Sequence, residues 1–450
     1  MASTAAQLAA SPLRSPLLNW LVTFLLAGCY TLAYLDRQII SLLIEPIQQD
    51  LAISDTEFGL LQGVSFSLFY VAASLPLAWL ADRTRRSFVM SGCVAFWSAM
   101  TMACGLAASF WQMMLARIGV AVGESGLTPA ALATLSDRFD RRLLASATAF
   151  YMLAPFVGGG LALGAGGALY SWAQRPATLA IPLFAGFSSW QIVFLVIGAF
   201  GLVPAAALLL IRDRPVRVAE KGPEPSRGFG EVFAIFRRHW KIYMTFQLAI
   251  AIVMVLLSSY VTWLPAAIMR SKEIDEAQVG SMFGPIYFLS GTIGTLSAGF
   301  LVTKLAGDDP VRTVMRYMLL MLALLWPLAS VGLLTDSLEV ELAMVGAALF
   351  LVSSVTSLSS LSFQYITPRH LRAQAIAIMA MVAALFGTGL GPVVAGVMSD
   401  QLASFAHPLS ASLAIIGFFT TPVAMALIWI ALRYHAATRL DLQARDTYPV

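Results

Sequence analysis

Long apolar stretches, separated by short polar connections, recur along the whole chain. Each has about 20 residues or more, the length that a helix needs to cross a bilayer. Because hydrocarbon offers the backbone no hydrogen-bond partners, such a segment must form its own bonds as a helix. The pattern therefore predicts twelve membrane-spanning helices. The predicted spans are residues 17–44, 58–81, 88–109, 111–135, 143–171, 190–211, 241–268, 279–303, 315–334, 340–365, 371–398 and 409–432.

The composition agrees with this pattern. Of 450 residues, 59% are hydrophobic and 12% are charged, whereas a soluble globular chain carries about a quarter charged residues. Cys29, Cys93 and Cys104 lie inside apolar stretches, and neither they nor the scattered histidines have the spacing of a disulfide framework, a metal site or a hydrolase motif. We expect an all-α membrane protein that is not an enzyme, with no metal, no cofactor and no nucleic-acid partner.

The charges orient the spans. When the N-terminus is placed in the cytoplasm, the connections on its side hold most of the lysines and arginines, and the opposite connections are acidic. The positive-inside rule then predicts that both termini are cytoplasmic. We expect the protein to lie in the inner (plasma) membrane of the cell. The inner connections carry Arg83, Arg85, Arg86, Arg138, Arg141, Arg142, Lys304, Arg312, Arg316, Arg369 and Arg372. The outer connections carry Arg175, Arg270, Lys272, Asp50, Asp55, Glu57, Asp336, Glu339, Glu341 and Asp400.

Short matches relate the two halves of the chain. EFGLLQG at 57–63 opens the second span, and QVGSMFG at 278–284 opens the eighth. RRLLA at 141–145 opens the fifth span, and RHLRA at 369–373 opens the eleventh. Two six-helix halves related by an axis along the membrane normal are a transporter architecture.

A charged, Pro- and Gly-containing linker divides the halves, with a short surface helix expected near 229–238. The predicted units are an N-terminal tail at 1–16, a six-helix bundle at 17–211, a cytoplasmic linker at 212–240, a second bundle at 241–433 and a C-terminal tail at 434–450.

Four ionisable residues lie inside predicted spans of the first half, and none lies well inside a span of the second. They are Asp36 and Arg37 in the first span, and Arg117 and Glu124 in the fourth. A charge within the bilayer costs several kcal/mol and marks a functional site by default. Arg117 and Glu124 are seven residues apart and share one helix face. Asp36 and Arg37 point about 100° apart, so one can face a cavity while the other packs against a neighbour.

These residues suggest proton coupling. Asp36 and Glu124 are the candidate titrating carboxylates. Burial raises the pKa of a carboxylate and a neighbouring arginine lowers it, so a change in access or in the distance to the arginine would bind or release a proton. In the alternative, fixed Asp–Arg and Glu–Arg pairs only lock the bundle. Arg37 and Arg117 are also candidates to dock an anionic headgroup.

The inner end of the second span is a candidate gate. An acid and a basic cluster, Asp82, Arg83 and Arg86, follow the helix there. Asp82 is placed to cap the N-terminal end of the eleventh span near Leu371, and Arg86 to pair with Asp137. Contacts that form in one conformation only would bias the equilibrium between conformations. The plainer alternative is a positive-inside anchor.

Small and polar residues complete the pattern. The glycine-rich runs at 158–167 and 387–396 predict close helix packing between the halves. Polar residues of the seventh span, among them Tyr260 and Trp263, are candidates to line the cavity. Helix packing is the alternative for them and for the serines of the tenth span.

Residues 78–86, with the twelve spans and the repeat, resemble the major facilitator superfamily. Ala78 and Arg85 stand where that family usually has glycine. More narrowly, residues 34–37 and 54–63, Arg117, and Glu124 after its glycine resemble the Spinster branch. The resemblance implies a proton-coupled carrier of lipid-like amphiphiles such as lysophospholipids or sphingoid phosphates, with Asp36, Arg37, Arg117 and Glu124 as its coupling and binding set.

The sequence therefore predicts a monomeric secondary transporter that works by alternating access, with a small amphiphile, protons and the bilayer as its partners. One alternative keeps the fold and carries a small organic anion such as a sugar acid, held by Arg37 and Arg117. A non-transporting sensor or a channel is a different class. Either would lack saturable flux coupled to protons.

Overall fold

The computed structural model describes residues 16–211, 230–305, 309–368 and 371–443. In that part of the chain, twelve helical segments are long and apolar enough to cross a membrane. All twelve predicted spans are confirmed, with differences of a few residues at their ends. The segments are Pro16–Leu42, Asp55–Arg83, Arg86–Gly105, Phe110–Ser136, Leu143–Ala173, Ser189–Leu208, Trp240–Lys272, Glu276–Leu305, Pro310–Leu334, Leu338–Ile366, Gln374–Gln401 and Pro408–His435.

Several spans consist of two shorter helices in sequence. The first half contains α2 (Pro16–Leu42), α3 (Ile44–Leu51), α4 (Asp55–Gln62), α5 (Val64–Arg83), α6 (Arg86–Gly105), α7 (Phe110–Ser125), α8 (Leu127–Ser136), α9 (Arg141–Tyr151), α10 (Ala154–Ala173), α11 (Pro176–Leu179), the 3₁₀ turn η1 (Pro182–Phe184) and α12 (Ser189–Leu208). The second half contains α13 (Gly230–Arg238), α14 (Trp240–Lys272), α15 (Glu276–Leu305), α16 (Pro310–Val331), the 3₁₀ turn η2 (Gly332–Leu334), α17 (Leu338–Ser357), α18 (Ser359–Ile366), α19 (Arg372–Val382), η4 (Ala383–Thr388), α20 (Leu390–Gln401) and α21 (Pro408–Gln443).

The second and eleventh spans are irregular where they face each other. In the second span, α4 gives way to α5 at Gly63. In the eleventh, η4 is a π-helical stretch, a feature that often accompanies bends in helices. A Cβ atom on Gly63 would collide with the backbone oxygen of Gly389. Only glycine therefore allows the two backbones to approach this closely.

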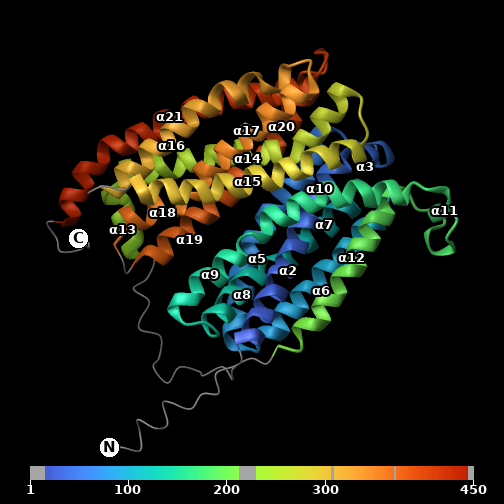
Figure 1. The fold of residues 1–450 in the computed structure, drawn as a ribbon, viewed down its shortest axis with the longest axis horizontal. Coiled ribbons are helices and arrows are strands. Elements are labelled where there is room, and N and C mark those ends of the chain that lie inside the picture. Colours follow the sequence, from blue (N-terminus) through green and yellow to red (C-terminus); the bar gives the residue numbers. More distant parts are fainter. Residues whose placement is uncertain (1–15, 212–229, 306–308, 369–370, 444–450) are drawn as a thin grey trace, which may run out of the picture.

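The two halves form separate bundles that meet mainly along α10 with α15 and α4 with α20, with smaller contacts of α2 with α14 and of α5 with η4. Figure 1 shows α10 beside α15. Glycines permit both main contacts, as the sequence predicts. A Cβ on Gly284 of α15 would lie 2.8 Å from the backbone nitrogen of Gly164 in α10. A Cβ on Gly59 of α4 would lie 2.6 Å from the backbone oxygen of Pro392 in α20.

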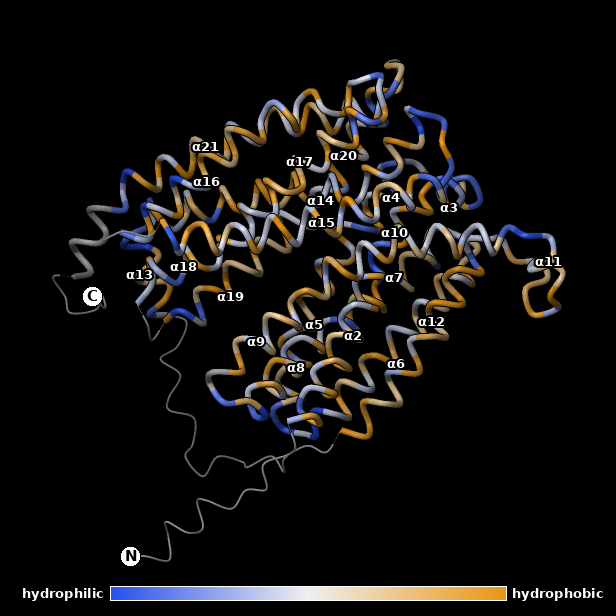
Figure 2. The backbone as a smooth tube through the Cα atoms, in the orientation of Figure 1, coloured by the Kyte–Doolittle hydropathy of each residue, from blue (hydrophilic) through white to orange (hydrophobic). Residues whose placement is uncertain are grey.

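The bundles meet at one end of the molecule and diverge at the other. We call the first the acidic end, because it carries Asp50, Asp55 and Asp400. We call the other the basic end, because it carries Arg83 and Arg312. In Figure 1 the ends of α8 and α9 lie well apart from those of α13 and α18 at the basic end. Figure 2 shows hydrophobic residues along the middle of the helices and hydrophilic ones concentrated at both ends.

The expected surface helix is present as α13, which begins at Gly230. Most of the predicted linker, residues 212–229, lies outside the described residues, as do the N-terminal tail through residue 15 and residues 444–450. The predicted domain boundaries therefore stay predictions.

The packing of α6 against α12 gives a test of the first bundle. A Cβ on Gly198 of α12 would lie 2.6 Å from the backbone oxygen of Ser98 and 2.7 Å from the backbone nitrogen of Met102. We expect Gly198→Ala to push the helices apart and to lower the free energy of unfolding by about 1–3 kcal/mol. The measurement is the thermal unfolding temperature in detergent.

Gly92→Ala on α6 is the matched control, because no atom lies within 4 Å of its Cβ position. Its effect should be neutral or stabilising by up to about 1 kcal/mol, since alanine favours the helix. Equal unfolding temperatures for the two variants would contradict this packing.

Candidate functional site

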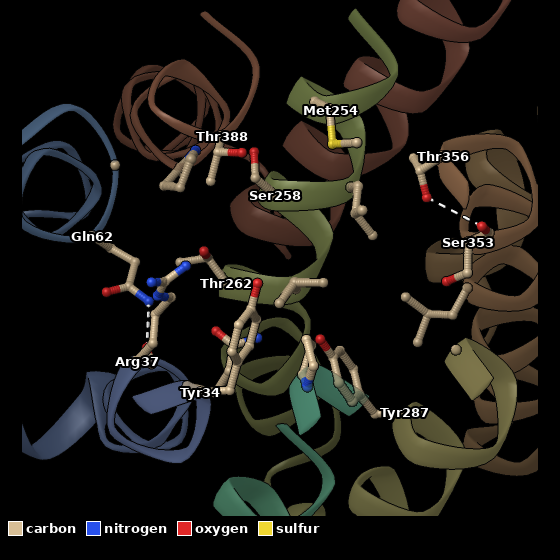
Figure 3. A pocket seen from close by; sticks show the side chains of 18 of the residues that line it. Tyr34, Arg37, Gln62, Met254, Ser258, Thr262, Tyr287, Ser353, Thr356 and Thr388 are labelled. Atoms are coloured by element: carbon tan, nitrogen blue, oxygen red, sulfur yellow. Dashed lines mark hydrogen bonds between the residues drawn. The ribbon is translucent and has the colours of Figure 1, made fainter. Parts of the chain in front are cut away.

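A cavity of about 320 Å³ lies between the two halves, and both contribute to its wall (Figure 3). Its volume falls within the range of small-molecule sites. The first half contributes mainly polar side chains, including Tyr34, Arg37, Gln38, Gln62 and Ser67. The second half contributes apolar and hydroxyl side chains, including Met254, Leu257, Val261, Leu349, Ser258 and Thr262. Among the described lining residues, Arg37 is the one that carries a charge.

Arg37 is held between a buried carboxylate and aromatic rings. Its Nη2 donates a hydrogen bond to Glu124 Oε2 at 2.5 Å. The Arg37 side chain is 21% exposed, whereas that of Glu124 is 1% exposed. The guanidinium carbon also lies 4.5 Å from the centre of the Phe66 ring and 4.8 Å from that of Tyr34. Arg37 therefore stands between the cavity and Glu124.

Gln62 connects the two arginines. Its Nε2 donates to the backbone oxygen of Arg37 at 2.8 Å (Figure 3), and its Oε1 accepts from Arg117 Nη2 at 2.8 Å. Arg117 is fully buried, while Gln62 lines the cavity. The sequence analysis assigned no role to Gln62. A signal was present, because Gln62 is a polar amide within EFGLLQG at 57–63, a motif that enters the membrane.

Asp36 points away from the cavity, as the 100° separation from Arg37 predicts. It is 2% exposed and accepts a hydrogen bond from the Thr101 hydroxyl of α6. The structure thus brings Asp36, Arg37, Arg117 and Glu124 into one cluster of α2 and α7, joined by Gln62 of α4. Arg37 and Gln62 reach the cavity, and the other three form the layer behind them.

The cluster is not a closed set of salt bridges. Asp36 Oδ1, Glu124 Oε1, and Nε and Nη1 of Arg117 are buried and have no protein hydrogen-bond partner. Such atoms are costly in a folded protein. A carboxylate with one free oxygen can accept a proton, and an arginine with free donors can take another anionic partner.

Tyr260 and Trp263, which the sequence places among the substrate-binding residues, do not reach the cavity in this conformation. The Tyr260 hydroxyl donates to the backbone oxygen of Ala329 at 2.7 Å. Trp263 Nε1 donates to the backbone oxygen of Pro392 at 2.9 Å. Their neighbours Ser258 and Thr262 line the cavity instead.

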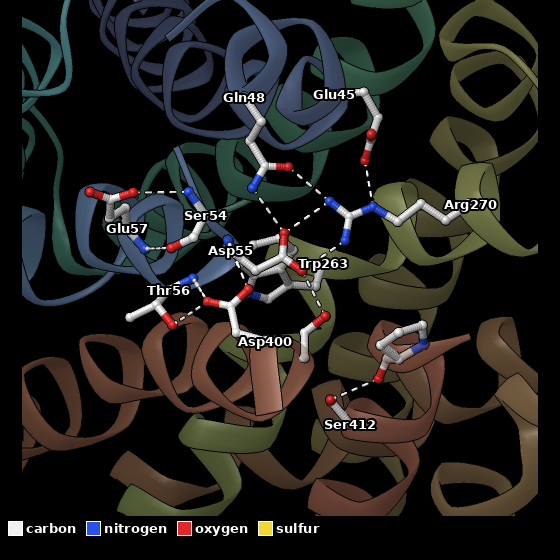
Figure 4. A network of polar contacts seen from close by, with 12 residues as sticks. Glu45, Gln48, Ser54, Asp55, Thr56, Glu57, Trp263, Arg270, Asp400 and Ser412 are labelled. Atoms are coloured by element: carbon white, nitrogen blue, oxygen red, sulfur yellow. Dashed lines mark hydrogen bonds and ion pairs between the residues drawn. The ribbon is translucent and has the colours of Figure 1, made fainter. Parts of the chain in front are cut away.

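A polar network joins the halves at the acidic end (Figure 4). Arg270 of α14 donates to Glu45 Oε1 at 2.6 Å, to Asp55 Oδ2 at 2.7 Å and to Gln48 Oε1 at 2.8 Å. These three partners belong to the first half. In the sequence analysis, Arg270 and Asp55 served only to orient the chain, because their contact spans more than two hundred residues.

Asp400 of α20 adds a second contact between the halves. Its carboxylate accepts from the backbone nitrogen of Thr56 at 2.9 Å and from that of Asp55 at 3.3 Å. It therefore caps the N-terminus of α4 from the other half, where the helix dipole favours a negative charge.

At the basic end, the predicted contact between Arg86 and Asp137 is present, with Nη1 and Oδ2 2.6 Å apart. Asp82 and Arg83 are exposed, and the Arg83 guanidinium lies over the ring of Trp79 at 4.1 Å. The cap of Asp82 on the helix after Leu371 and the gating role of all four residues stay predictions.

The comparison with known families covers most of the chain. The family model described as Major Facilitator Superfamily matches residues 26–392. An MFS-type efflux pump of Mycolicibacterium smegmatis is 28% identical over 384 residues, 85% of each chain. A probable L-galactonate transporter of Escherichia coli is 28% identical over 297 residues, 62% of this chain and 61% of that one. The sphingosine-1-phosphate transporter SPNS2 of Danio rerio is 22% identical over 403 residues, 82% and 74% of the two chains.

A solved structure is similar over nearly its whole length. It is a bacterial homologue of the human lysosomal transporter Spinster, in an inward-facing and unoccupied conformation. The TM-score is 0.79 at 27% sequence identity, and the match covers 96% of this chain and 98% of that one.

The network at the acidic end gives a conformational test. We expect Arg270→Gln to separate the halves there, because it leaves Glu45, Asp55 and Asp400 near one another without this cation. Spin labels at the exposed positions Gln49 and Gln401, each changed to cysteine, report the distance by pulsed electron resonance. The native cysteines are buried. A population at longer distance should appear in Arg270→Gln.

Arg175→Gln is the matched control, since Arg175 is an exposed cation at the same end. A distance distribution in Arg270→Gln identical to that of the control would show that the network does not hold the halves together.

Proposed function

Because the chain belongs to the major facilitator superfamily, whose members are transporters and not enzymes, we propose that its cargo is a lipid-like amphiphile with an anionic head and that protons drive its transport. A lysophospholipid and a sphingoid phosphate are two examples of such a substrate. The observation that carries the proposal is a cavity with one charged lining residue, Arg37, and a buried acid directly behind it.

The two walls of the cavity suit the two parts of an amphiphile. The guanidinium of Arg37 offers a fork of donors that matches a phosphate or carboxylate. On the opposite wall, Met254, Leu257 and Val261 of α14 offer an apolar surface to a hydrocarbon tail. The name of the Danio rerio relative gives it a substrate of this type, which supports the assignment.

Competition for Arg37 couples the substrate to the proton. When Glu124 is ionised, it neutralises Arg37, and an anionic head gains little by approaching. When Glu124 takes up a proton, its charge is lost and Arg37 is free to bind the anion. A buried carboxylate without its cation is itself neutral by preference, because burying an unpaired charge is costly. Anion and proton therefore bind together.

Asp36 is the second proposed proton site. It lies on α2 next to Arg37, in the same cluster as Arg117 of α7, and it accepts a hydrogen bond from the Thr101 hydroxyl. Arg117 keeps the cluster's charge in balance when Asp36 is ionised, and its bond to Gln62 transmits changes at the cavity wall to this inner layer.

The distribution of charges supports one orientation in the membrane. We place both termini in the cytoplasm and the protein in the cell's inner membrane, as a monomer. In this orientation the basic end faces the cytoplasm, and we infer that the cavity opens there, where the bundles diverge; the inward-facing conformation of the bacterial Spinster homologue supports this inference. During the transition, Asp82 approaches the start of α19, while Arg83, Arg86 and Asp137 shape that surface. The network of Arg270 opens at the same time.

A sugar acid is the second candidate substrate. The Escherichia coli relative is named a probable L-galactonate transporter. Arg37 lines the cavity and can hold a carboxylate there, with Arg117 in the layer behind it. Uptake of a lysophospholipid and of galactonate into liposomes under a pH gradient distinguishes the two. A protein that takes up galactonate and ignores the lipid would overturn the preferred assignment.

The coupling role of Glu124 gives a mutant test. We expect Glu124→Gln to reduce uptake driven by a pH gradient to background, because the amide cannot exchange a proton. Exchange of labelled for unlabelled substrate without a gradient should persist, because it needs no net proton movement. Both rates are measured in the same proteoliposomes.

Glu339→Gln serves as the control, since Glu339 is an exposed acid on α17. Normal gradient-driven uptake by Glu124→Gln would remove Glu124 from the coupling mechanism.

The apolar wall gives a test of the tail. We expect Leu257→Asn to weaken binding of a lysophospholipid roughly tenfold, because the tail loses an apolar contact. Binding of galactonate should not change. Leu257→Met, which keeps the wall apolar, is the control, and ligand-induced thermal shift is the readout. Equal losses for both ligands would argue against a tail at this wall.

A further inference from the structure

A second pocket, of about 340 Å³, lies outside the central cavity, between the start of α16 and residues 429–435 of α21 at the basic end. Six residues line it. Asp309 and Arg312 come from the start of α16, and Trp429, Leu432, Arg433 and His435 come from α21. Figure 1 shows these two helices side by side at the outer edge of the second bundle.

The two arginines supply positive charge that the pocket does not cancel. Arg312 and Arg433 are exposed, and neither forms an ion pair with another described residue. The Arg433 guanidinium carbon lies 3.6 Å from the centre of the Trp429 ring, which fixes its position without neutralising it.

The acid of the pocket already has partners. Asp309 Oδ1 accepts from the backbone nitrogen of Arg312 at 3.1 Å and lies 3.0 Å from His435 Nε2. Asp309 thus caps the N-terminus of α16 and contacts α21 at His435, the last residue of its membrane-spanning segment. Its carboxylate is engaged by these contacts, whereas the guanidinium groups of Arg312 and Arg433 are available to an anion.

The position of the pocket is that of a lipid headgroup. It lies where two membrane-spanning segments, Pro310–Leu334 and Pro408–His435, reach their common end. Trp429 is 46% exposed at this level, and tryptophan is enriched where the membrane meets water.

An apolar stripe leads from the pocket toward the bilayer centre. Phe419, Val423, Trp429 and Arg433 follow at steps of four, six and four residues, which places them on one side of α21. Phe419 is 63% and Val423 is 48% exposed. A free phosphate would make no use of this stripe, but an acyl chain attached to the phosphate would lie along it.

We propose that this pocket binds the phosphate of an anionic phospholipid, with Arg312 and Arg433 on the phosphate and the acyl chains along the exposed face of α21. The site lies apart from the translocation cavity and does not depend on the identity of the transported substrate. Basic pockets between membrane helices on the cytoplasmic side bind anionic headgroups in this way.

Native mass spectrometry of the detergent-purified chain tests the site. Phosphatidylglycerol and phosphatidylcholine with the same acyl chains are the probes. We expect the wild type to retain phosphatidylglycerol preferentially. The double variant Arg312→Gln, Arg433→Gln should lose roughly 25-fold of this affinity, since each cation near a membrane surface contributes about fivefold.

Two further variants locate the effect. Arg85→Gln with Arg237→Gln removes two exposed arginines elsewhere on the basic end and should keep the wild-type preference. Arg37→Gln, which alters the central cavity, should keep it too. Loss of the preference in Arg37→Gln alone would assign the lipid to the cavity and overturn the proposal.

The remaining outcomes are also decisive. Equal retention of the two lipids by the wild type, or unchanged retention by the double variant, would contradict the site. If inorganic phosphate in excess binds in the pocket and no lipid is retained, the pocket is a phosphate site and the lipid proposal is wrong. If the double variant does not fold, salt added to the wild type replaces it as the test. Salt should release bound phosphatidylglycerol and leave the retention of phosphatidylcholine unchanged, because it screens the charges of the arginines. Retention of phosphatidylglycerol that is insensitive to salt would overturn the proposal.

Discussion

The contact between Arg37 and Glu124 organises the polar wall of the central cavity. A buried acid and a half-buried arginine meet at 2.5 Å in an apolar bundle, where neither charge is stable alone. Phe66 and Tyr34 confine the guanidinium at the cavity wall. A change in the charge of Glu124 therefore changes the net charge that the cavity offers to a ligand. Conversely, an anion that binds Arg37 changes the electrostatic environment of Glu124.

One short helix touches both the charge cluster and the closed end of the molecule. α4 begins at Asp55, which Arg270 and Asp400 bind from the second half, and it ends at Gln62, which bonds to both Arg37 and Arg117. Gly63 separates α4 from α5, so this helix is not continuous with the rest of its span. The closure of the acidic end and the charge cluster thus share one structural element.

The sequence was informative where the signal is local. Hydropathy defined the spans because each must satisfy its own backbone in lipid, and helix geometry separated Asp36 from Arg37. The contacts of Gln62 and Arg270 were missed because they join distant segments. The polar positions of α14 do not by themselves tell which face meets the cavity: Ser258 and Thr262 line it, whereas Tyr260 and Trp263 bond to neighbouring helices in this conformation. The substrate-binding role of Tyr260 and Trp263 stays a prediction.

The central claim is that the anion and the proton bind together through Arg37 and Glu124. In the direct measurement, a lysophospholipid with an anionic head is added to the purified protein in weak buffer, and a pH indicator reports the uptake of protons. Binding to the wild type should take up protons, and the uptake should be lost in Glu124→Gln while binding persists. Binding to the wild type without proton uptake would contradict the claim, as would an uptake that Glu124→Gln leaves unchanged.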